Sequence, residues 1–242
     1  DGIMIARGDL GVEIPPENVP YLQKLIIQKC NDNYRPVITA TQMLDSMIRN
    51  PRPTRAEVTD VANAVYDGTD AVMLSGETAS GKYPLEALQM MVHIVENTEE
   101  HLDYDLIMRK AEEQRMKSTS SALSHATVTT ANNLGAKCII APTASGATAR
   151  VVSKFKPRTE IIGVTPNEEV MRRMQIYWGV RPLKSIEFTT TEDVCSGAID
   201  LVVAKQIVET GDVVVLTAGI PSPHFSGQKE GVSNIMRIAV IQ

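Results

Sequence analysis

In the first third of this 242-residue chain, a polar segment directly follows each of three apolar runs. A carboxylate beside free backbone N–H groups suits a divalent metal and an anionic substrate. Because parallel strands bring their C-terminal ends to one rim of a sheet, we expect the three segments to converge there. They are Arg7-Gly8-Asp9 after Ile3–Ala6, Thr41-Gln42 after Val37–Ala40, and Ser75-Gly76-Glu77 after Ala71–Leu74.

Each segment also has an ordinary structural interpretation. Arg7 and Asp9 could form a surface pair in a simple turn, and Thr41 could cap a helix or bond to the backbone. A second candidate site follows the run Cys138–Ala141, where hydroxyls, a glycine and free N–H groups would form an anion cradle at a helix start. An ordinary Ser/Thr-rich N-cap fits that segment equally well. Its candidate residues are Thr143, Ser145, Gly146, Ala147 and Thr148.

Strand and helix signals alternate along the chain, which predicts parallel sheets with short crossovers. We expect a turn after Ala6 and a loop at 75–82, and a polar boundary at 103–119 separates domains at 1–102 and 120–242. The expected helices are 19–31, 54–67 with a capping box from Thr54 to Glu57, 84–102, 120–134 before Gly135, one opened by a capping box at Thr165, and 191–210 before Gly211. The other expected strands are 138–141, 161–165, 181–183, 213–217 and 236–241.

Composition excludes several classes of protein. The net charge of −5, without a basic cluster, argues against nucleic acid or an anionic membrane as a partner. No apolar run approaches the roughly 20 residues of a membrane-spanning helix. The four histidines are scattered, so we expect no zinc site. The three cysteines, Cys30, Cys138 and Cys195, lie far apart, which favours buried, reduced thiols in a cytosolic protein.

Several long segments together resemble pyruvate kinase, in the family's order and over nearly the whole chain. The resemblance implies an α/β fold: a partial TIM (β/α)8 barrel followed by a C-terminal three-layer α/β/α domain with a mostly parallel sheet. It also implies a cytoplasmic homotetramer that transfers phosphate from phosphoenolpyruvate to ADP in glycolysis, giving pyruvate and ATP. The matching segments are Ala6–Pro16, Ile38–Met47, Asn50–Val65 and Val72–Ala79.

The resemblance also assigns roles to individual residues. Asp9 would be a ligand of a catalytic Mg²⁺ or Mn²⁺, and the N–H groups of Gly8 and Asp9 would hold the substrate carboxylate. Thr41 would lie beside the enolate and deliver or relay a proton. Arg7 and Glu77 complete the expected catalytic residues, from less direct positions.

Parts of the family's site do not occur in this sequence. The family's second carboxylate ligand, its phosphate-neutralising Lys and its K⁺ site come from strands that would precede Asp1. The chain also starts within a strand, with no start methionine and no signal peptide. We therefore expect an incomplete portion of the enzyme that is inactive alone. The alternatives are a non-catalytic module that binds a phosphate effector and, less consistent with the motifs, an aldolase-type lyase.

By resemblance, the segment 143–148 would bind an allosteric effector. Members regulated by fructose bisphosphate hold its second phosphate with a Trp and an Arg, but the corresponding segment Thr190–Cys195 is acidic, and Trp178 comes too early. This departure favours a sugar monophosphate or AMP. The segment 219–233, with His224 and Lys229, would close over the effector or would be a plain surface loop.

Overall fold

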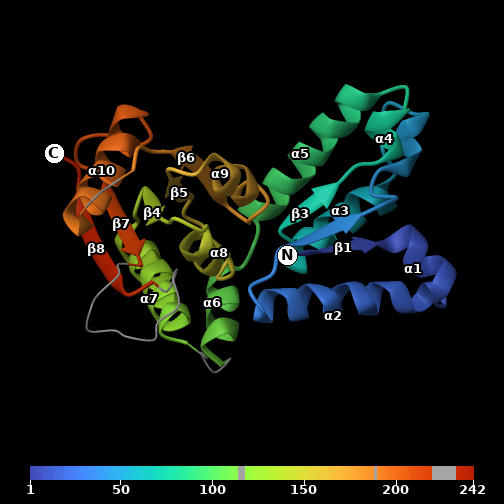
Figure 1. The fold of residues 1–242 in the computed structure, drawn as a ribbon. Coiled ribbons are helices and arrows are strands. Elements are labelled where there is room, and N and C mark those ends of the chain that lie inside the picture. Colours follow the sequence, from blue (N-terminus) through green and yellow to red (C-terminus); the bar gives the residue numbers. More distant parts are fainter. Residues whose placement is uncertain (114–117, 188–189, 220–232) are drawn as a thin grey trace. The chain divides into compact units, whose positions relative to one another are not determined.

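The computed structural model describes residues 1–113, 118–187, 190–219 and 233–242, and these residues form two compact units (Figure 1). The first unit spans Asp1–Asp103, and the second spans Tyr104–Gln242. Each unit is built on its own sheet, with three strands in the first and five in the second. Among the described residues, no helix combines the length and the apolar character needed to cross a membrane.

The first unit is a parallel sheet of β1 (Ile3–Ala6), β2 (Val37–Ala40) and β3 (Ala71–Met73), in that order. In the pairing register, Ala6 lies level with Ala40, and Ala40 lies level with Met73. The segments that follow the three strands therefore start at the same rim. The helices of this unit are α1 (Arg7–Glu13), the 3-10 turn η1 (Pro16–Asn18), α2 (Val19–Asp32), η2 (Asp45–Ile48), α3 (Arg55–Tyr66), α4 (Gly76–Ala79) and α5 (Pro84–Glu100).

Helix α3 begins with the capping box that the sequence predicts. The Glu57 N–H donates to the Thr54 hydroxyl at 3.3 Å, and the Thr54 N–H donates to the Glu57 carboxylate at 2.7 Å. The same carboxylate accepts from the N–H and the hydroxyl of Ser46. Partial burial raises the pKa of Glu57, but the hydrogen bonds from Ser46 and Thr54 outweigh it and hold the pKa below its usual value. Glu57 thus fixes both the start of α3 and the turn η2.

The second unit is a three-layer α/β/α sandwich. Its sheet has the order β6-β5-β4-β7-β8, parallel except for β8, which pairs antiparallel with β7. Side chains of α7, α8 and α9 pack on one face with Ile139, and side chains of α10 pack on the other face with Ile140. The strands are β4 (Cys138–Pro142), β5 (Ile161–Thr165), β6 (Val180–Lys184), β7 (Val213–Ala218) and β8 (Ile235–Val240), and the helices are α6 (Tyr104–Glu113), α7 (Thr119–Leu134), α8 (Ala147–Ser153), α9 (Glu168–Met174) and α10 (Thr191–Ala204).

All three cysteines are buried and form no disulfide, as the sequence predicts. Cys138 lies within β4, and burial, together with the charges of Glu160 and Asp212, raises its pKa to about 12. Burial likewise raises the pKa of Cys195. Both groups are therefore protonated, unreactive thiols near neutral pH.

Several predicted element boundaries are wrong, each for a local reason. The expected turn after Ala6 is the helix α1, and the expected loop 75–82 contains the short helix α4. The expected capping box at Thr165 does not form, because Asn167 caps α9 by accepting from two backbone N–H groups. Helix α10 ends at Ala204, before the expected stop at Gly211, because Gln206 adopts a φ of +54° and reverses the chain.

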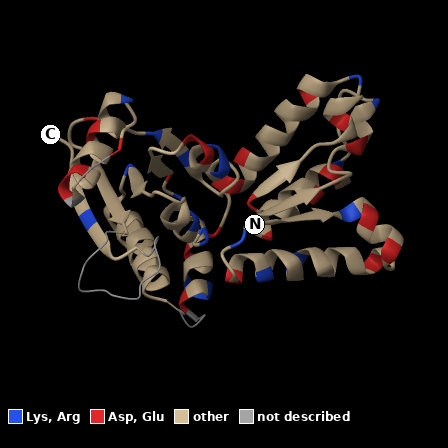
Figure 2. Ribbon diagram, in the orientation of Figure 1, with Lys and Arg blue, Asp and Glu red and all other residues tan. Residues whose placement is uncertain are grey.

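The polar segment at 103–119 is more structured than its composition indicates. Residues 104–113 form α6, and its Met108 and Ala111 pack against the core of the second unit. Charged residues of both signs are interspersed along this helix and its neighbours (Figure 2). The helix thus has one face for the core and one for solvent, a pattern in which the apolar positions are outnumbered.

Candidate functional site

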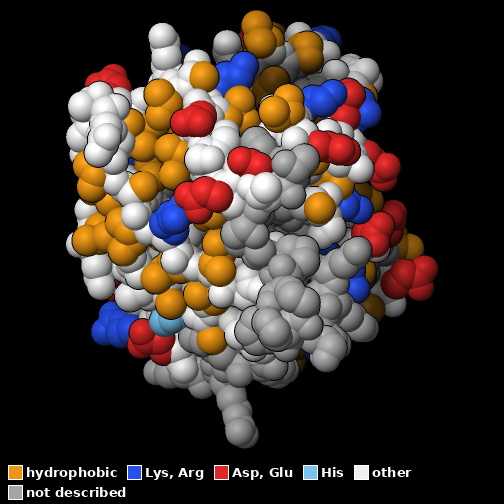
Figure 3. Space-filling model, turned by 60° about the vertical axis from the view of Figure 1, so that its left-hand side comes forward, with side chains coloured by type: hydrophobic (Ala, Val, Ile, Leu, Met, Phe, Trp, Pro, Cys, Tyr) orange, Lys and Arg blue, Asp and Glu red, His pale blue; other side chains and the backbone are white. Residues whose placement is uncertain are grey.

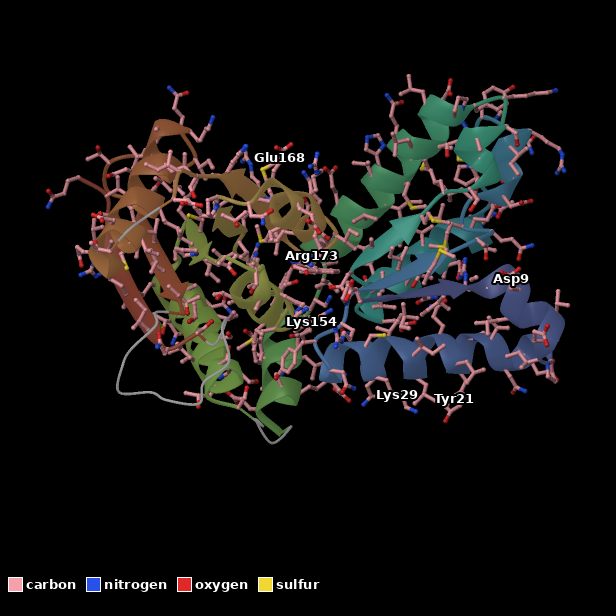
Figure 4. All side chains as sticks on the ribbon, in the orientation of Figure 1. Asp9, Tyr21, Lys29, Lys154, Glu168 and Arg173 are labelled. Atoms are coloured by element: carbon pink, nitrogen blue, oxygen red, sulfur yellow. The ribbon has the colours of Figure 1, made fainter. Side chains whose placement is uncertain are left out.

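The first site lies at the C-terminal rim of the three-stranded sheet, where the structure brings the predicted segments together. The Gly8 N–H donates to the Thr41 hydroxyl at 2.8 Å, which joins the segments after β1 and β2. The Glu77 carboxylate accepts the Leu44 N–H at 3.0 Å, which joins the segments after β3 and β2. Asp9 is exposed in the first turn of α1, beyond the end of β1 (Figure 4). The expected convergence at one rim is thus present in the geometry.

The turn after β2 has an unusual backbone. Thr41 has a φ of +69° and Gln42 a φ of +54°, so two consecutive residues with side chains are left-handed. For a β-branched residue such as Thr41 this conformation is a genuine outlier. Each such residue costs on the order of 1–3 kcal/mol, and the conformation persists only where surrounding contacts enforce it. Neighbouring side chains must therefore stabilise this turn.

The guanidinium of Arg7 supplies much of that support. Its Nη2 group donates to the Thr41 carbonyl at 2.8 Å and contacts the Met43 sulfur, and its Nε donates to the Ala40 carbonyl at 3.3 Å. Its Nη1 group donates to Asp60 of α3 at 2.7 Å and to Gln23 of α2 at 3.4 Å. All five N–H donors of the guanidinium thus have acceptors within the protein. The site as described leaves Arg7 no donor for a substrate.

Glu77 supports the far end of the same turn. Its side chain is only 2% exposed, and its two oxygens accept different backbone donors. One oxygen accepts the Leu44 N–H, and the other accepts the Ser75 N–H at 2.8 Å. The carboxylate therefore fixes the turn after β2 against the end of β3. The sequence identified the residue but gave no signal for these partners.

Asp9 is the described group of this rim that suits a metal. A computed model carries no ions, so the test is the donor set. Across the described ranges, no cluster of three or more His, Cys, Asp or Glu side chains could hold an ion. Magnesium, however, is commonly held by one or two carboxylates together with oxygens of the substrate. The exposed Asp9 carboxylate fits one such position.

The second site is the segment between β4 and α8. The Gly146 N–H donates to the Thr143 hydroxyl at 2.9 Å, and Gly146, with a φ of +81°, lies at the N-cap of α8. Ser145 is exposed, whereas Thr148 is buried and its hydroxyl is bonded to the Ser233 hydroxyl at 3.2 Å. Thr143, Ser145, Gly146 and Ala147 therefore lie in the loop and the first turn, as predicted, while Thr148 is directed into the core.

Two arginines near this unit's predicted site were missed by the sequence reasoning. Arg173 of α9 donates to the Ser145 carbonyl at 3.0 Å, and it is labelled in Figure 4. Arg237 of β8 donates to both oxygens of Glu192 at 2.8 and 3.3 Å. This hydrogen-bonded pair lowers the pKa of Glu192. Neither arginine is adjacent to the motif in sequence, so no local pattern indicated them. His224 and Lys229 lie outside the described residues.

These features define a two-domain α/β protein, in which strand ends of a barrel-type sheet carry one site and a three-layer sandwich carries another. Residues 1–88 match the model of the pyruvate kinase barrel domain, and residues 121–239 match that of the pyruvate kinase alpha/beta domain. The chain belongs to the pyruvate kinase family.

Individual relatives agree with this assignment. The chain is 48% identical over 242 residues to a pyruvate kinase of Clostridium acetobutylicum and covers 50% of its length. It is 49% identical to the pyruvate kinase of Geobacillus stearothermophilus, over 100% of this chain and 40% of that protein. A solved pyruvate kinase structure from Cryptosporidium parvum superposes with a TM-score of 0.89 at 40% identity, over 100% of this chain and 47% of the other. The chain thus spans about half the length of the curated relatives it matches.

Proposed function

We propose that this chain is the part of a pyruvate kinase that carries one half of the catalytic rim and the regulatory domain. The reaction would be phosphoryl transfer from phosphoenolpyruvate to ADP. The observation that carries the proposal is the meeting of Gly8 and Thr41 at the rim beside the exposed Asp9, within segments that match the family model. The wider family is a glycolytic transferase, and we propose a cytoplasmic location.

Each rim residue has a proposed task. Asp9 would hold Mg²⁺ or Mn²⁺, which supplies charge neutralisation for the phosphate and enolate oxygens. The first-turn N–H groups of α1 lack acceptors within the helix, so the Asp9 N–H would bind the substrate carboxylate. The Thr41 hydroxyl accepts the Gly8 N–H and keeps its own proton to donate to the substrate. A K⁺ site, a Lys and a second carboxylate would come from residues outside this chain.

The first experiment is an intact-mass measurement beside a lactate-dehydrogenase-coupled assay for pyruvate. We expect no turnover from a polypeptide of 26.4 kDa, and Mg²⁺-dependent turnover from a longer polypeptide that contains this chain. The expected cause is the missing lysine and glutamate, since a phosphoryl group without compensating charge is not transferred efficiently. Turnover at 26.4 kDa would contradict the assignment of those two residues as essential.

The second candidate function is a regulatory module that binds a phosphate effector at 143–148. The free loop between β4 and α8 supports it, because Gly146 and Thr143 hold a compact turn with the exposed Ser145 beside it. Such binding needs none of the residues that are expected from outside this chain. Binding without turnover, in a polypeptide of full length, would favour this alternative.

We expect ribose 5-phosphate or AMP to bind at least 10-fold more tightly than fructose 1,6-bisphosphate. A second phosphate requires a free cation, whereas Arg237 is already bonded to Glu192 and Asp193 adds negative charge nearby. Isothermal titration of both ligand types measures the difference, and Ser145→Asp serves as the control that repels either phosphate. Tighter binding of the bisphosphate would reject the monophosphate assignment.

Assembly into a homotetramer is part of the same proposal. The outward side of the edge strand β8 exposes Met236, Ile238 and Val240, at 37%, 49% and 60%. Hydrophobic side chains are visible on this side of the second unit (Figure 3). An edge strand with exposed apolar residues favours contact with another chain. Sedimentation at micromolar concentration measures the assembly state.

A further inference from the structure

We propose that Arg7 and Glu77 are positioning residues, which hold the left-handed turn at Thr41–Gln42 and thereby fix the direction of the Thr41 hydroxyl. The inference rests on the proposed function, because Thr41 is there the proton donor. It replaces a direct catalytic role for the two charged residues with an indirect one. The contacts of the turn carry the argument.

The turn is held at both ends by charged groups from neighbouring strands. At its start, Arg7 donates to the carbonyls of Ala40 and Thr41 at 3.3 and 2.8 Å. At its end, Glu77 accepts the Leu44 N–H at 3.0 Å. Between these supports lie the two residues with positive φ. Without either support, the backbone would gain by relaxing to an ordinary conformation.

Both charged groups are themselves fixed. Arg7 is bonded to Asp60 at 2.7 Å and to Gln23 at 3.4 Å, and Gln23 in turn donates to Asp67 at 3.0 Å. Glu77 is buried, and its second oxygen accepts the Ser75 N–H. Side chains with every bond satisfied inside the protein are suited to hold a turn rather than to bind a ligand or exchange a proton.

The proposal predicts a specific pattern in Glu77→Gln and Arg7→Lys. The glutamine amide cannot accept both N–H groups, and a lysine has three donors where the guanidinium has five. In the longer polypeptide that shows turnover, we expect kcat to fall 10- to 100-fold. The KM for phosphoenolpyruvate should change less than threefold, and both limbs of the pH profile of kcat should stay in place. Loss of a limb in Glu77→Gln, or full kcat in Arg7→Lys, would overturn the proposal.

The substitution Gln42→Gly tests the strain directly, because glycine adopts a positive φ without steric cost. Alone, it should raise the denaturant midpoint of unfolding. Combined with Glu77→Gln, it should recover at least fivefold of the lost kcat. Neither result is expected if Glu77 acts on the substrate, so an unchanged midpoint or an absent recovery contradicts the positioning role.

Glu57→Gln is the matched control, since Glu57 also accepts backbone N–H groups in this unit but does not contact the turn. It should lower stability and leave kcat unchanged; an equal loss of kcat would mean that general destabilisation explains the effect. Hydrogen exchange of the Leu44 amide should be at least 10-fold faster in Glu77→Gln than in Glu57→Gln. This readout needs no activity, so it decides the proposal even if the wild-type protein shows no turnover; equal exchange in the two variants would overturn it.

Discussion

Replacing Asp9 with asparagine lowers metal-dependent turnover by about 10³-fold in the longer polypeptide that the proposed function requires. The physical reason is the loss of one negative charge next to a divalent ion. At about 4 Å and an effective dielectric constant of 20, a pair of unit charges interacts by about 4 kcal/mol, which corresponds to roughly three powers of ten. The carboxylate is exposed and in the first turn of α1, so the substitution removes charge without opening the core.

Two measurements separate this role from a structural one. Binding of Mn²⁺, followed by electron paramagnetic resonance, should weaken in parallel with turnover, and the free energy of unfolding should change by less than about 0.5 kcal/mol. Asp32→Asn is the control, because Asp32 is also exposed but ends α2, far along the chain from the rim segments. Unchanged Mn²⁺ affinity in Asp9→Asn would refute the assignment of Asp9 as a metal ligand.

The sequence predicted the rim of the first unit because its signals are local. Apolar runs such as Val37–Ala40 define strands, and in a parallel sheet the C-terminal ends must share one edge. The capping box at Thr54 was equally readable, since both partners lie within one turn. Fold class and the meeting of Gly8 with Thr41 therefore follow from pattern and topology alone.

What the sequence could not predict depends on contacts between distant residues. The Arg7 side chain meets Asp60, which lies 53 positions away, and no periodic pattern encodes that pairing. The left-handed turn at Thr41–Gln42 contradicts local propensity, which disfavours a positive φ for both residue types. Helix α1 was missed for the same reason, because its two glycines indicated a turn. Local rules thus failed where the candidate site is strained, as expected for functional positions.

The conclusion for Arg7 illustrates the difference between motif and geometry. From the sequence, a cation beside Asp9 was an expected catalytic residue. In the structure its donors all point to Ala40, Thr41, Met43, Gln23 and Asp60. Membership of a motif therefore does not establish contact with a substrate, and a residue that orients the reacting group can share the motif with one that touches it.

In the second unit, Ile140→Ala should lower the free energy of unfolding by about 3 kcal/mol. Ile140 is fully buried in β4, where it packs with Ile162 and Leu216 under α10, so its removal leaves a cavity that the neighbouring strands cannot close. Ile140→Val removes one methylene and should cost about 1 kcal/mol. Urea unfolding followed by circular dichroism measures both values.

The same substitution connects core packing to the proposed regulatory site. Strand β4 ends at Pro142, and the Thr143 N–H that follows donates to the Val164 carbonyl of β5 at 2.8 Å. A loosened β4 therefore moves the loop in which Thr143 holds Gly146, and effector affinity should fall together with stability. Ile186→Ala, at a side chain that is 76% exposed, is the control and should change neither quantity. A loss of less than 1 kcal/mol in Ile140→Ala would mean that this face of the sheet is not the tightly packed core described for the second unit.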